Sequence, residues 1–339
     1  MSNHTSIELF SGAGGMTLGL EKSGFNPVLL NDNDKYACET LRLNRPHWNI
    51  QEKDIKDIDF SYLKGKIDLI SGGFPCQPFS YAGKLLGLND LYGSLVFEMI
   101  RAIQEVKPKV FLMENVKGLQ TICNGKVIEI ILNSIEKINY KIIEYDIYNS
   151  LYFRVPQKRE RLIIIGIRND LYKKVGIYDK SLFLDNKIYT LQDAFKKGSL
   201  YDTDVPYSEG LKYNKWKETI MSHVPEGGNW KNLSKDMQKE YMKDSLKSKG
   251  GKTGMAKRLS WNLPSPTLTC SPYQKQTEKC HPKETRPLTV REYARIQTFP
   301  DNWIFSGSLS QIYKQIGNAV PVNMSYIIGK RIINMIKDI

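Results

Sequence analysis

The chain has 339 residues, of which 41% are hydrophobic, and its 49 Lys and Arg outnumber its 36 Asp and Glu to give a formal net charge of +13. This length suits one large domain or two of ordinary size, and the charge favours a polyanionic partner, although membranes and acidic proteins also attract cations. Five scattered cysteines without a Cys-x-x-Cys pair argue against a disulfide scaffold or a zinc ribbon, so we expect no structural metal. No basic leader or bilayer-length apolar run occurs, so we expect a soluble, cytoplasmic protein without membrane contact.

From residue 5 to about 170, short apolar runs alternate with amphipathic stretches. This alternation is typical of repeated strand–helix units and of a mostly parallel sheet. The expected strands are 6–10, 27–31, 67–71, 109–114, 140–148 and 161–167. The expected helices are 17–24, 35–44, 95–106 and 126–138, where apolar residues recur at three- and four-residue spacing. The pattern therefore predicts an α/β fold.

The loop Ser11-Gly12-Ala13-Gly14-Gly15 follows the first expected strand and precedes a helix. Its glycines permit a ligand to approach the backbone at a positive helix amino terminus, although the spacing is not Gly-x-Gly-x-x-Gly and a dinucleotide would fit equally well. Asp32 ends the second strand, where a carboxylate can accept hydrogen bonds from both ribose hydroxyls. Alternatively, Asp32 or Asp34 caps the helix that begins near Lys35.

Cys76 stands between two prolines in Gly-Gly-Phe-Pro-Cys-Gln-Pro-Phe-Ser, just after the apolar run 67–70. The glycines allow a sharp turn at the strand end and the prolines fix the backbone, so the sulfur would have one defined direction. A thiol at such an edge can act as a nucleophile if nearby positive groups favour its thiolate. The alternative is a small buried core residue.

Further candidates lie at the ends of later strands. Glu114 ends an apolar strand, where partial burial would keep a proton available for acid catalysis; otherwise it is a helix cap or a surface carboxylate. Two-residue alternation puts Arg159 and Arg161 on one face of a strand, with Gln157 a further step back. Arginine suits the recognition of phosphate and base oxygens, and the alternative is a solvated charge cluster.

Between about 185 and 285 the alternation fades, and Lys, Ser, Gly, Tyr and Trp become frequent. We expect a second, smaller domain here, because Trp216, Trp230 and Trp261 supply more aromatic mass than a disordered linker carries. Helical periodicity returns at 290–297 and 324–336.

These segments belong to an ordered set of motifs that spans nearly the whole chain. The set comprises residues 8–16, 31–34, 54–55, 72–80, 93–95, 114–116, 157–161, 286–292 and 315–322. In content and order it resembles the DNA (cytosine-5) methyltransferases of bacterial restriction-modification systems. The resemblance implies a Rossmann-like S-adenosylmethionine-dependent methyltransferase domain with a smaller target-recognition domain. Its expected parts are a catalytic and cofactor-binding domain at 1–184, a target-recognition domain at 185–285, and a segment at 286–339 whose last helix packs back on the first domain.

The resemblance also assigns roles to residues of this chain. Cys76 would add to carbon 6 of cytosine, Glu114 would protonate ring nitrogen 3, and Arg161 would hold the carbonyl oxygen and orient Glu114, with Arg159 nearer the phosphate and Cys76. Residues placed around S-adenosylmethionine are Phe10, Gly12, Ala13, Gly14, Asp32, Asn33, Asp54, Ile55, Pro75, Leu95 and Asn318. Residues expected to contact DNA are Ser80, Lys84 and Gln157.

The activity expected on these grounds is sequence-specific methylation of carbon 5 of a cytosine that is flipped out of double-stranded DNA. We further expect a monomer, and a companion restriction endonuclease that acts on the same site without forming a stable complex. Two alternatives are an RNA cytosine-5 methyltransferase acting on tRNA, which the sizeable basic domain disfavours, and a non-catalytic DNA regulator, which would be expected to lack Cys76 or Glu114.

Overall fold

The computed structural model describes residues 4–75, 94–246 and 253–339, which form two compact units. The first unit takes in the described parts of Met1–Phe153, Glu160–Leu184 and Val320–Ile339, and the second those of Arg154–Arg159 and Asp185–Ala319. We expected a segment at 286–339 whose last helix packs back on the first domain. Residues 286–319 pack within the second unit, and the first unit resumes at Val320.

Within the described residues, seven strands of the first unit form one sheet in the order β3-β2-β1-β4-β5-β8-β6. Adjacent strands from β3 to β5 are parallel, whereas β8 runs antiparallel to both β5 and β6. The predicted α/β fold with a mostly parallel sheet is confirmed. The strands are β1 (His4–Leu9), β2 (Phe25–Asp32), β3 (Ile50–Glu52), β4 (Leu69–Gly72), β5 (Val110–Val116), β6 (Tyr140–Asn149) and β8 (Glu160–Arg168).

The middle of the sheet is buried on both faces, which explains the continuous apolar sequence of β5. Phe111 of β5 lies opposite Gly166 of β8, and a Cβ at position 166 would overlap the Phe111 ring. Glycine therefore lets the two neighbouring strands pair while the large ring stays in the core.

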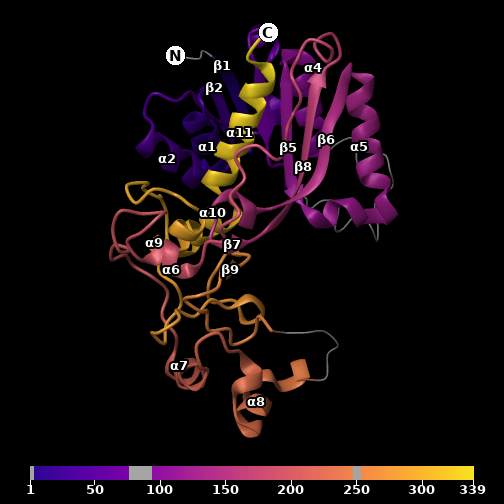
Figure 1. Ribbon diagram of the computed structural model, residues 1–339. Helices are drawn as coiled ribbons and strands as arrows, with labels where there is room; N and C mark the ends of the chain where they lie inside the picture. Colours follow the sequence, from indigo (N-terminus) through magenta and orange to yellow (C-terminus); the bar gives the residue numbers. More distant parts are fainter. Residues whose placement is uncertain (1–3, 76–93, 247–252) are drawn as a thin grey trace. The chain divides into compact units, whose positions relative to one another are not determined.

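Helices cover the sheet on both faces. They are α1 (Gly15–Ser23), α2 (Lys35–Asn44), α4 (Leu95–Val106), α5 (Lys126–Lys137) and α11 (Val322–Ile336). Helix α11 runs beside α1, as expected for the last helix (Figure 1). A Cβ at Gly19 of α1 would overlap the Val322 carbonyl, so glycine permits this close approach. The 3-10 turns of this unit are η1 (Ile55–Asp57), η2 (Ser61–Leu63), η4 (Lys117–Gly125) and η5 (Ser150–Phe153).

The second unit has a small core and little regular sheet. Its core includes Ile220, Met221, Tyr241, Met242 and Cys280, all nearly inaccessible to solvent, so the described part of this region is folded rather than a disordered linker. Its elements are α6 (Leu191–Phe195), α7 (Lys215–Ser222), α8 (Lys235–Met242), α9 (Val290–Ile296), α10 (Leu309–Asn318), a parallel pair of β7 (Gln157–Lys158) and β9 (Ser265–Pro266), and the turns η6 (Trp230–Asn232), η7 (Lys243–Leu246) and η8 (Lys275–Thr277). Across the described ranges, no helix is long and apolar enough to span a bilayer.

Candidate active site

Most of the expected cofactor residues follow parallel strands of the first unit. Because β3, β2, β1 and β4 are adjacent and parallel, their carboxyl ends meet at one edge of the sheet, where open α/β folds bind ligands. Leu95, the first residue of α4, packs partly against the core of the same unit. The expected cofactor residues that lie at or just beyond these strand ends are Phe10, Gly12, Ala13, Gly14, Asp32, Asn33, Asp54, Ile55 and Pro75.

The loop between β1 and α1 turns through left-handed backbone angles, with φ of 56° at Phe10, 52° at Gly12 and 82° at Gly14, which is the N-cap of α1. The Ser11 N–H donates to the Asn31 carbonyl (3.0 Å), which fixes the loop on β2. A Cβ built at Gly12 would meet no atom within 4 Å, so the space above this backbone is open to a ligand.

Asp32 connects this loop to the end of β2. Its Oδ2 accepts the Gly12 N–H (2.7 Å) and its Oδ1 accepts the Asp34 N–H (2.8 Å). Burial raises the pKa of Asp32, opposed by these backbone hydrogen bonds. The helix cap is Asp34, whose Oδ1 accepts the N–H groups of Tyr36 and Ala37, so the capping alternative for Asp32 is wrong. Each carboxylate oxygen has a second lone pair with which it can accept a ribose hydroxyl.

The outer part of this edge is polar and accessible. Asn33 and Asp54 are exposed, and Asp54 caps η1 by accepting the Lys56 N–H at 3.0 Å. Ile55, immediately after it, is buried. An open glycine backbone, a strand-end carboxylate that can still accept hydroxyl groups and a mixed polar and apolar rim together fit a nucleoside ligand.

Glu114 and Arg161 form an ion pair at the adjoining end of β5 and β8. Arg161 Nε lies 2.8 Å from Glu114 Oε1, and the two side chains are only 12% and 10% exposed. The Arg161 Nη1 also donates to the Glu160 carbonyl (2.7 Å), which limits the rotation of its guanidinium. The carboxyl group is thus held in one orientation, although it is reachable at the sheet edge.

Two neighbours shape the approach to this carboxyl. A Cβ at Gly73 would stand 2.9 Å from Glu114 Oε2, so glycine leaves room for the carboxyl group. Asn115 is buried, and its Nδ2 donates to the Phe74 carbonyl at 2.9 Å. Asn115 therefore ties the segment after β4 to the strand that carries Glu114. Sequence reasoning gave Asn115 no role, although it lies in the motif Glu114-Asn115-Val116.

Three predicted site residues, Cys76, Ser80 and Lys84, lie outside the described residues. The segment that leads to Cys76 is described as far as Pro75, which is exposed.

Gln157 and Arg159 are interior residues of the second unit. Gln157 Nε2 donates to Gln297 Oε1 (2.7 Å), and its Oε1 accepts the Leu268 N–H (2.8 Å). Arg159 is 1% exposed, and its guanidinium donates to the carbonyls of Leu268, Gly317 and Asn318. The expected contact of Gln157 with DNA and the role of Arg159 near phosphate stay predictions, which this buried conformation does not support.

The expected single strand through these residues is wrong. Gln157 and Lys158 form β7 with β9, while β8 begins at Glu160 in the first unit. Arg159 follows β7 and belongs to the second unit, where its guanidinium donates to the carbonyls of Gly317 and Asn318. Asn318, the last residue of α10, also belongs to the second unit, where its Oδ1 accepts a hydrogen bond from the Cys270 thiol at 3.3 Å.

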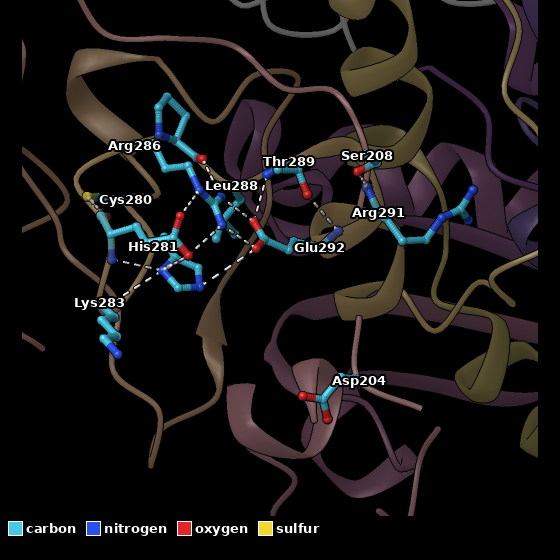
Figure 2. Close-up of polar contacts among 12 residues, drawn as sticks. Asp204, Ser208, Cys280, His281, Lys283, Arg286, Leu288, Thr289, Arg291 and Glu292 are labelled. Carbon is cyan, nitrogen blue, oxygen red and sulfur yellow. Dashed lines mark hydrogen bonds and ion pairs between the residues drawn. The ribbon is translucent and has the colours of Figure 1, made fainter. Parts of the chain in front are cut away.

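The motif at 286–292 forms a polar cluster inside the second unit. The Arg286 guanidinium makes two 2.8 Å hydrogen bonds to the Glu292 carboxylate, and His281 lies beside them with Nε2 3.7 Å from Glu292 Oε1 (Figure 2). Thr289 and Glu292 complete a capping box at the start of α9. This motif therefore holds the segments before α9 together.

The C-5 cytosine-specific DNA methylase family model matches residues 4–334. The chain belongs to this family and is accordingly a DNA (cytosine-5)-methyltransferase.

Among curated relatives, it is 60% identical to the type II methyltransferase M.PspPI of Psychrobacter sp. (strain TA137) over 98% of this chain and 80% of that protein. It is 56% identical to M.Eco47II of Escherichia coli over 99% of this chain and 80% of that protein. These relatives place it with the methyltransferases of restriction-modification systems.

Solved structures agree on the fold. An E. coli prophage protein described as a DNA modification methyltransferase matches with a TM-score of 0.69 and 25% identity, covering 99% of this chain and 100% of that one. DNMT2 of Spodoptera frugiperda, in a triple mutant, matches with a TM-score of 0.63 and 21% identity over 97% of this chain and 99% of that one, which shows the fold alone.

Proposed function

We propose that this enzyme transfers a methyl group from S-adenosylmethionine to carbon 5 of one cytosine in a specific double-stranded DNA sequence. The observation that carries the proposal is the Glu114–Arg161 pair beside a glycine-rich, nucleoside-compatible sheet edge in the same unit. The target base has to be flipped out of the helix, because stacking covers the ring faces in a duplex.

The chemistry requires a nucleophile and an acid. The Cys76 thiolate adds to carbon 6, while Glu114 donates a proton to ring nitrogen 3 as charge develops there, which makes carbon 5 nucleophilic. Arg161 holds the Glu114 carboxyl group and donates to the base carbonyl oxygen. After methylation, loss of the carbon 5 proton expels the thiolate and restores the aromatic ring.

The cofactor supplies an electrophilic methyl group. Gly12 and its neighbours admit the cofactor close to the backbone, and Asp32 accepts its ribose hydroxyls. Phe10 and Ile55 contribute apolar contacts, and Asn33 and Asp54 polar ones. Leu95 and Pro75 complete the residues that we assign to it in the first unit. The expected contact of Asn318 with the cofactor stays a prediction.

The second unit is proposed to read the DNA sequence. It carries no acid or nucleophile expected for the methyl transfer, and it presents many exposed lysines, including Lys215, Lys231, Lys235 and Lys239. Lysines bind phosphates in any sequence, whereas loop side chains can read base edges. A companion endonuclease would act on the same target without binding this monomer.

Methylation of DNA with labelled S-adenosylmethionine, followed by mapping of the modified cytosines, tests the proposal. We expect 5-methylcytosine at a single sequence context in DNA and no labelling of tRNA. Labelling of tRNA alone would instead favour the RNA enzyme, and cofactor binding without any labelling would favour a regulator.

The covalent step is tested with Cys76→Ser. This variant should bind DNA and cofactor but lose methylation, because the hydroxyl is a far weaker nucleophile than the thiolate. DNA with 5-fluorocytosine at the target should trap wild-type protein in an adduct that survives denaturation, since fluorine does not leave as the proton does. Full activity of Cys76→Ser, or no trapped adduct, contradicts the covalent mechanism.

A further inference from the structure

Residues 272–279 of the second unit form a loop that its own backbone closes. The Lys279 N–H donates to the Pro272 carbonyl (3.0 Å), where the two ends of the loop meet. At the tip, the Thr277 N–H donates to the Gln274 carbonyl (3.1 Å) in the turn η8. The loop therefore has a defined base and a defined tip without belonging to a sheet.

A single buried ammonium group binds both ends of this loop. Lys217 of α7 lies 2.8 Å from Glu278 Oε1, and its Nζ also donates to the Tyr273 carbonyl at 3.3 Å. The Lys217 side chain is 7% exposed and that of Glu278 is 0% exposed. The ammonium also lies 4.2 Å from the centre of the Tyr273 ring.

The second oxygen of Glu278 is bound as well. Tyr241 of α8 donates to Glu278 Oε2 (3.0 Å), and its hydroxyl accepts the Ala256 N–H (3.1 Å). A Cβ at Gly254 would overlap the Gln276 carbonyl, so the backbone near Gly254 lies directly against the tip of the loop. Helices α7 and α8 and this backbone together fix the position of the tip.

The tip itself is polar and exposed, and consists of Gln274, Lys275 and Gln276. Glutamine can donate and accept at adenine N6 and N7, and lysine can donate to guanine O6 and N7, so these side chains suit base edges in the major groove. Burying an ion pair requires the desolvation of two charges, which a loop needed only for packing could avoid with an apolar pair. A loop that reads base edges, in contrast, needs one fixed shape.

We propose that the Lys217–Glu278 pair determines sequence specificity by positioning the turn at 274–276 against base edges of the DNA target. The inference rests on the proposed function, because it assumes that the second unit recognises DNA. Lys217 and Glu278 act as positioning residues, and Gln274, Lys275 and Gln276 contact the bases.

The reading side chains are tested first, because they are exposed and outside the core of the second unit. Gln274→Ala and Gln276→Ala are compared with Gln192→Ala, an exposed glutamine of α6 in the same unit. Binding is measured by fluorescence anisotropy without cofactor, on the mapped target duplex, on duplexes with one base pair changed, and on an unrelated duplex. At least one tip variant should bind the target roughly 5- to 100-fold more weakly, with relaxed discrimination at one base pair. Gln192→Ala should match wild type.

Lys217→Met tests the positioning. It should lose discrimination between the target and its single-base variants, while affinity for the unrelated duplex and for S-adenosylmethionine stays within about twofold of wild type. Lys217→Arg keeps the positive charge in a side chain of different shape, so it should recover part of the discrimination. If Lys217→Met does not fold, Lys217→Arg is compared with wild type in its place.

The outcomes separate the two proposals. If wild type methylates a defined target while both tip variants keep its affinity and discrimination, the inference is overturned and the proposed function stands. If Lys217→Met weakens binding equally for all duplexes, the pair has only a structural role. If wild type neither binds nor methylates DNA, the proposed function itself fails.

Discussion

Single side chains at the sheet edge combine charge with burial, and their chemistry depends on how they are held. Glu114 is nearly enclosed, bound by Arg161 on one oxygen and bordered by Gly73 on the other. An acid catalyst has to present its proton in one direction, and these neighbours supply that constraint.

We therefore expect Glu114→Gln to slow methylation by roughly 10²- to 10⁴-fold, because the amide keeps the shape but cannot protonate the base. Cofactor affinity, measured by calorimetry, should change little. Glu160→Gln is the matched control, because Glu160 is a partly exposed carboxylate of β8 paired with Lys117. A Glu114→Gln rate near wild type would assign Glu114 to structure.

Glu8 in β1 is a second buried acid, and it gives a prediction about stability. Burial raises the pKa of Glu8 from 4.5 to about 8, and the charge of Asp32 adds to this rise. The folded protein keeps a proton that the unfolded chain releases above pH 4.5, so the stabilisation present below that pH is lost as the pH rises towards 8.

Glu8→Gln should remove this dependence, since the amide does not ionise. Thermal unfolding at pH 5 and at pH 9 provides the comparison. Between pH 5 and pH 9, ionisation of Glu8 should lower the free energy of unfolding of wild type by at most ~1.4 kcal/mol for each unit of its pKa shift. The variant should lack this loss. Equal losses in the two proteins would show that Glu8 is ionised in the folded state.

Helices with a periodic apolar pattern were predictable from the sequence, whereas strands whose pairing depends on residues far away in the chain were not. Helices α2 and α4 have the predicted bounds, because their apolar spacing is a local signal, reinforced in α2 by the Asp34 cap. The sequence does not show that β8 is antiparallel, because its apolar run would suit either direction. The split between β7 and β8 escaped prediction because the partners of Arg159 lie more than 100 residues away.

The same reasoning explains which parts of the site could be predicted. Glycine loops and strand-end carboxylates have local signatures, so the positions of Gly12, Asp32 and Glu114 at the sheet edge were foreseeable. The bond from Asn115 to Phe74 joins two segments far apart in the sequence, and the Lys217–Glu278 pair depends on a helix and a loop with no common pattern.

The segment before α9 gives a prediction for acidic conditions. Burial, as the main cause, lowers the pKa of His281 below 6.5, and the nearby positive charges of Arg286 and Arg258 act in the same direction against Glu292 and Glu284. Its Nδ1 accepts the Glu284 N–H (3.0 Å), a bond that requires an unprotonated nitrogen. As the pH drops, the His281 side chain takes up a proton in the unfolded chain at a higher pH than in the folded protein. The contribution of His281 to stability should therefore fall as the pH drops below about 6.5.

The contribution of His281 should therefore lower the unfolding temperature of wild type at pH 5 relative to pH 7, opposite in sign to the contribution of Glu8, so it is measured as the difference between wild type and a His281 variant. His281→Gln, with an amide that can accept the same N–H, should lose less stability than wild type, or gain more, when the pH falls from 7 to 5. His223→Gln serves as the control, because His223 is an exposed residue at the end of α7 in the same unit. Identical pH profiles for wild type and His281→Gln would contradict the assigned cause.

At the scale of the molecule, cofactor chemistry and target reading are assigned to different units. Grafting residues 185–285 into a relative with a different target should change which cytosines are methylated, while cofactor affinity stays that of the recipient. The modified positions are found by mapping 5-methylcytosine. If the recipient keeps its original target, sequence reading lies elsewhere.

The position of α11 against α1 has a consequence for synthesis on the ribosome. Strands and helices of the first unit emerge early, but the face of α1 that packs against α11 stays uncovered until the residues after 320 have left the exit tunnel. By then residues 185–319 have emerged and can fold as a unit of their own. The first unit therefore completes its packing only after the second unit has emerged, so the nascent chain exposes the apolar face of α1 until α11 emerges, and chaperones can bind there.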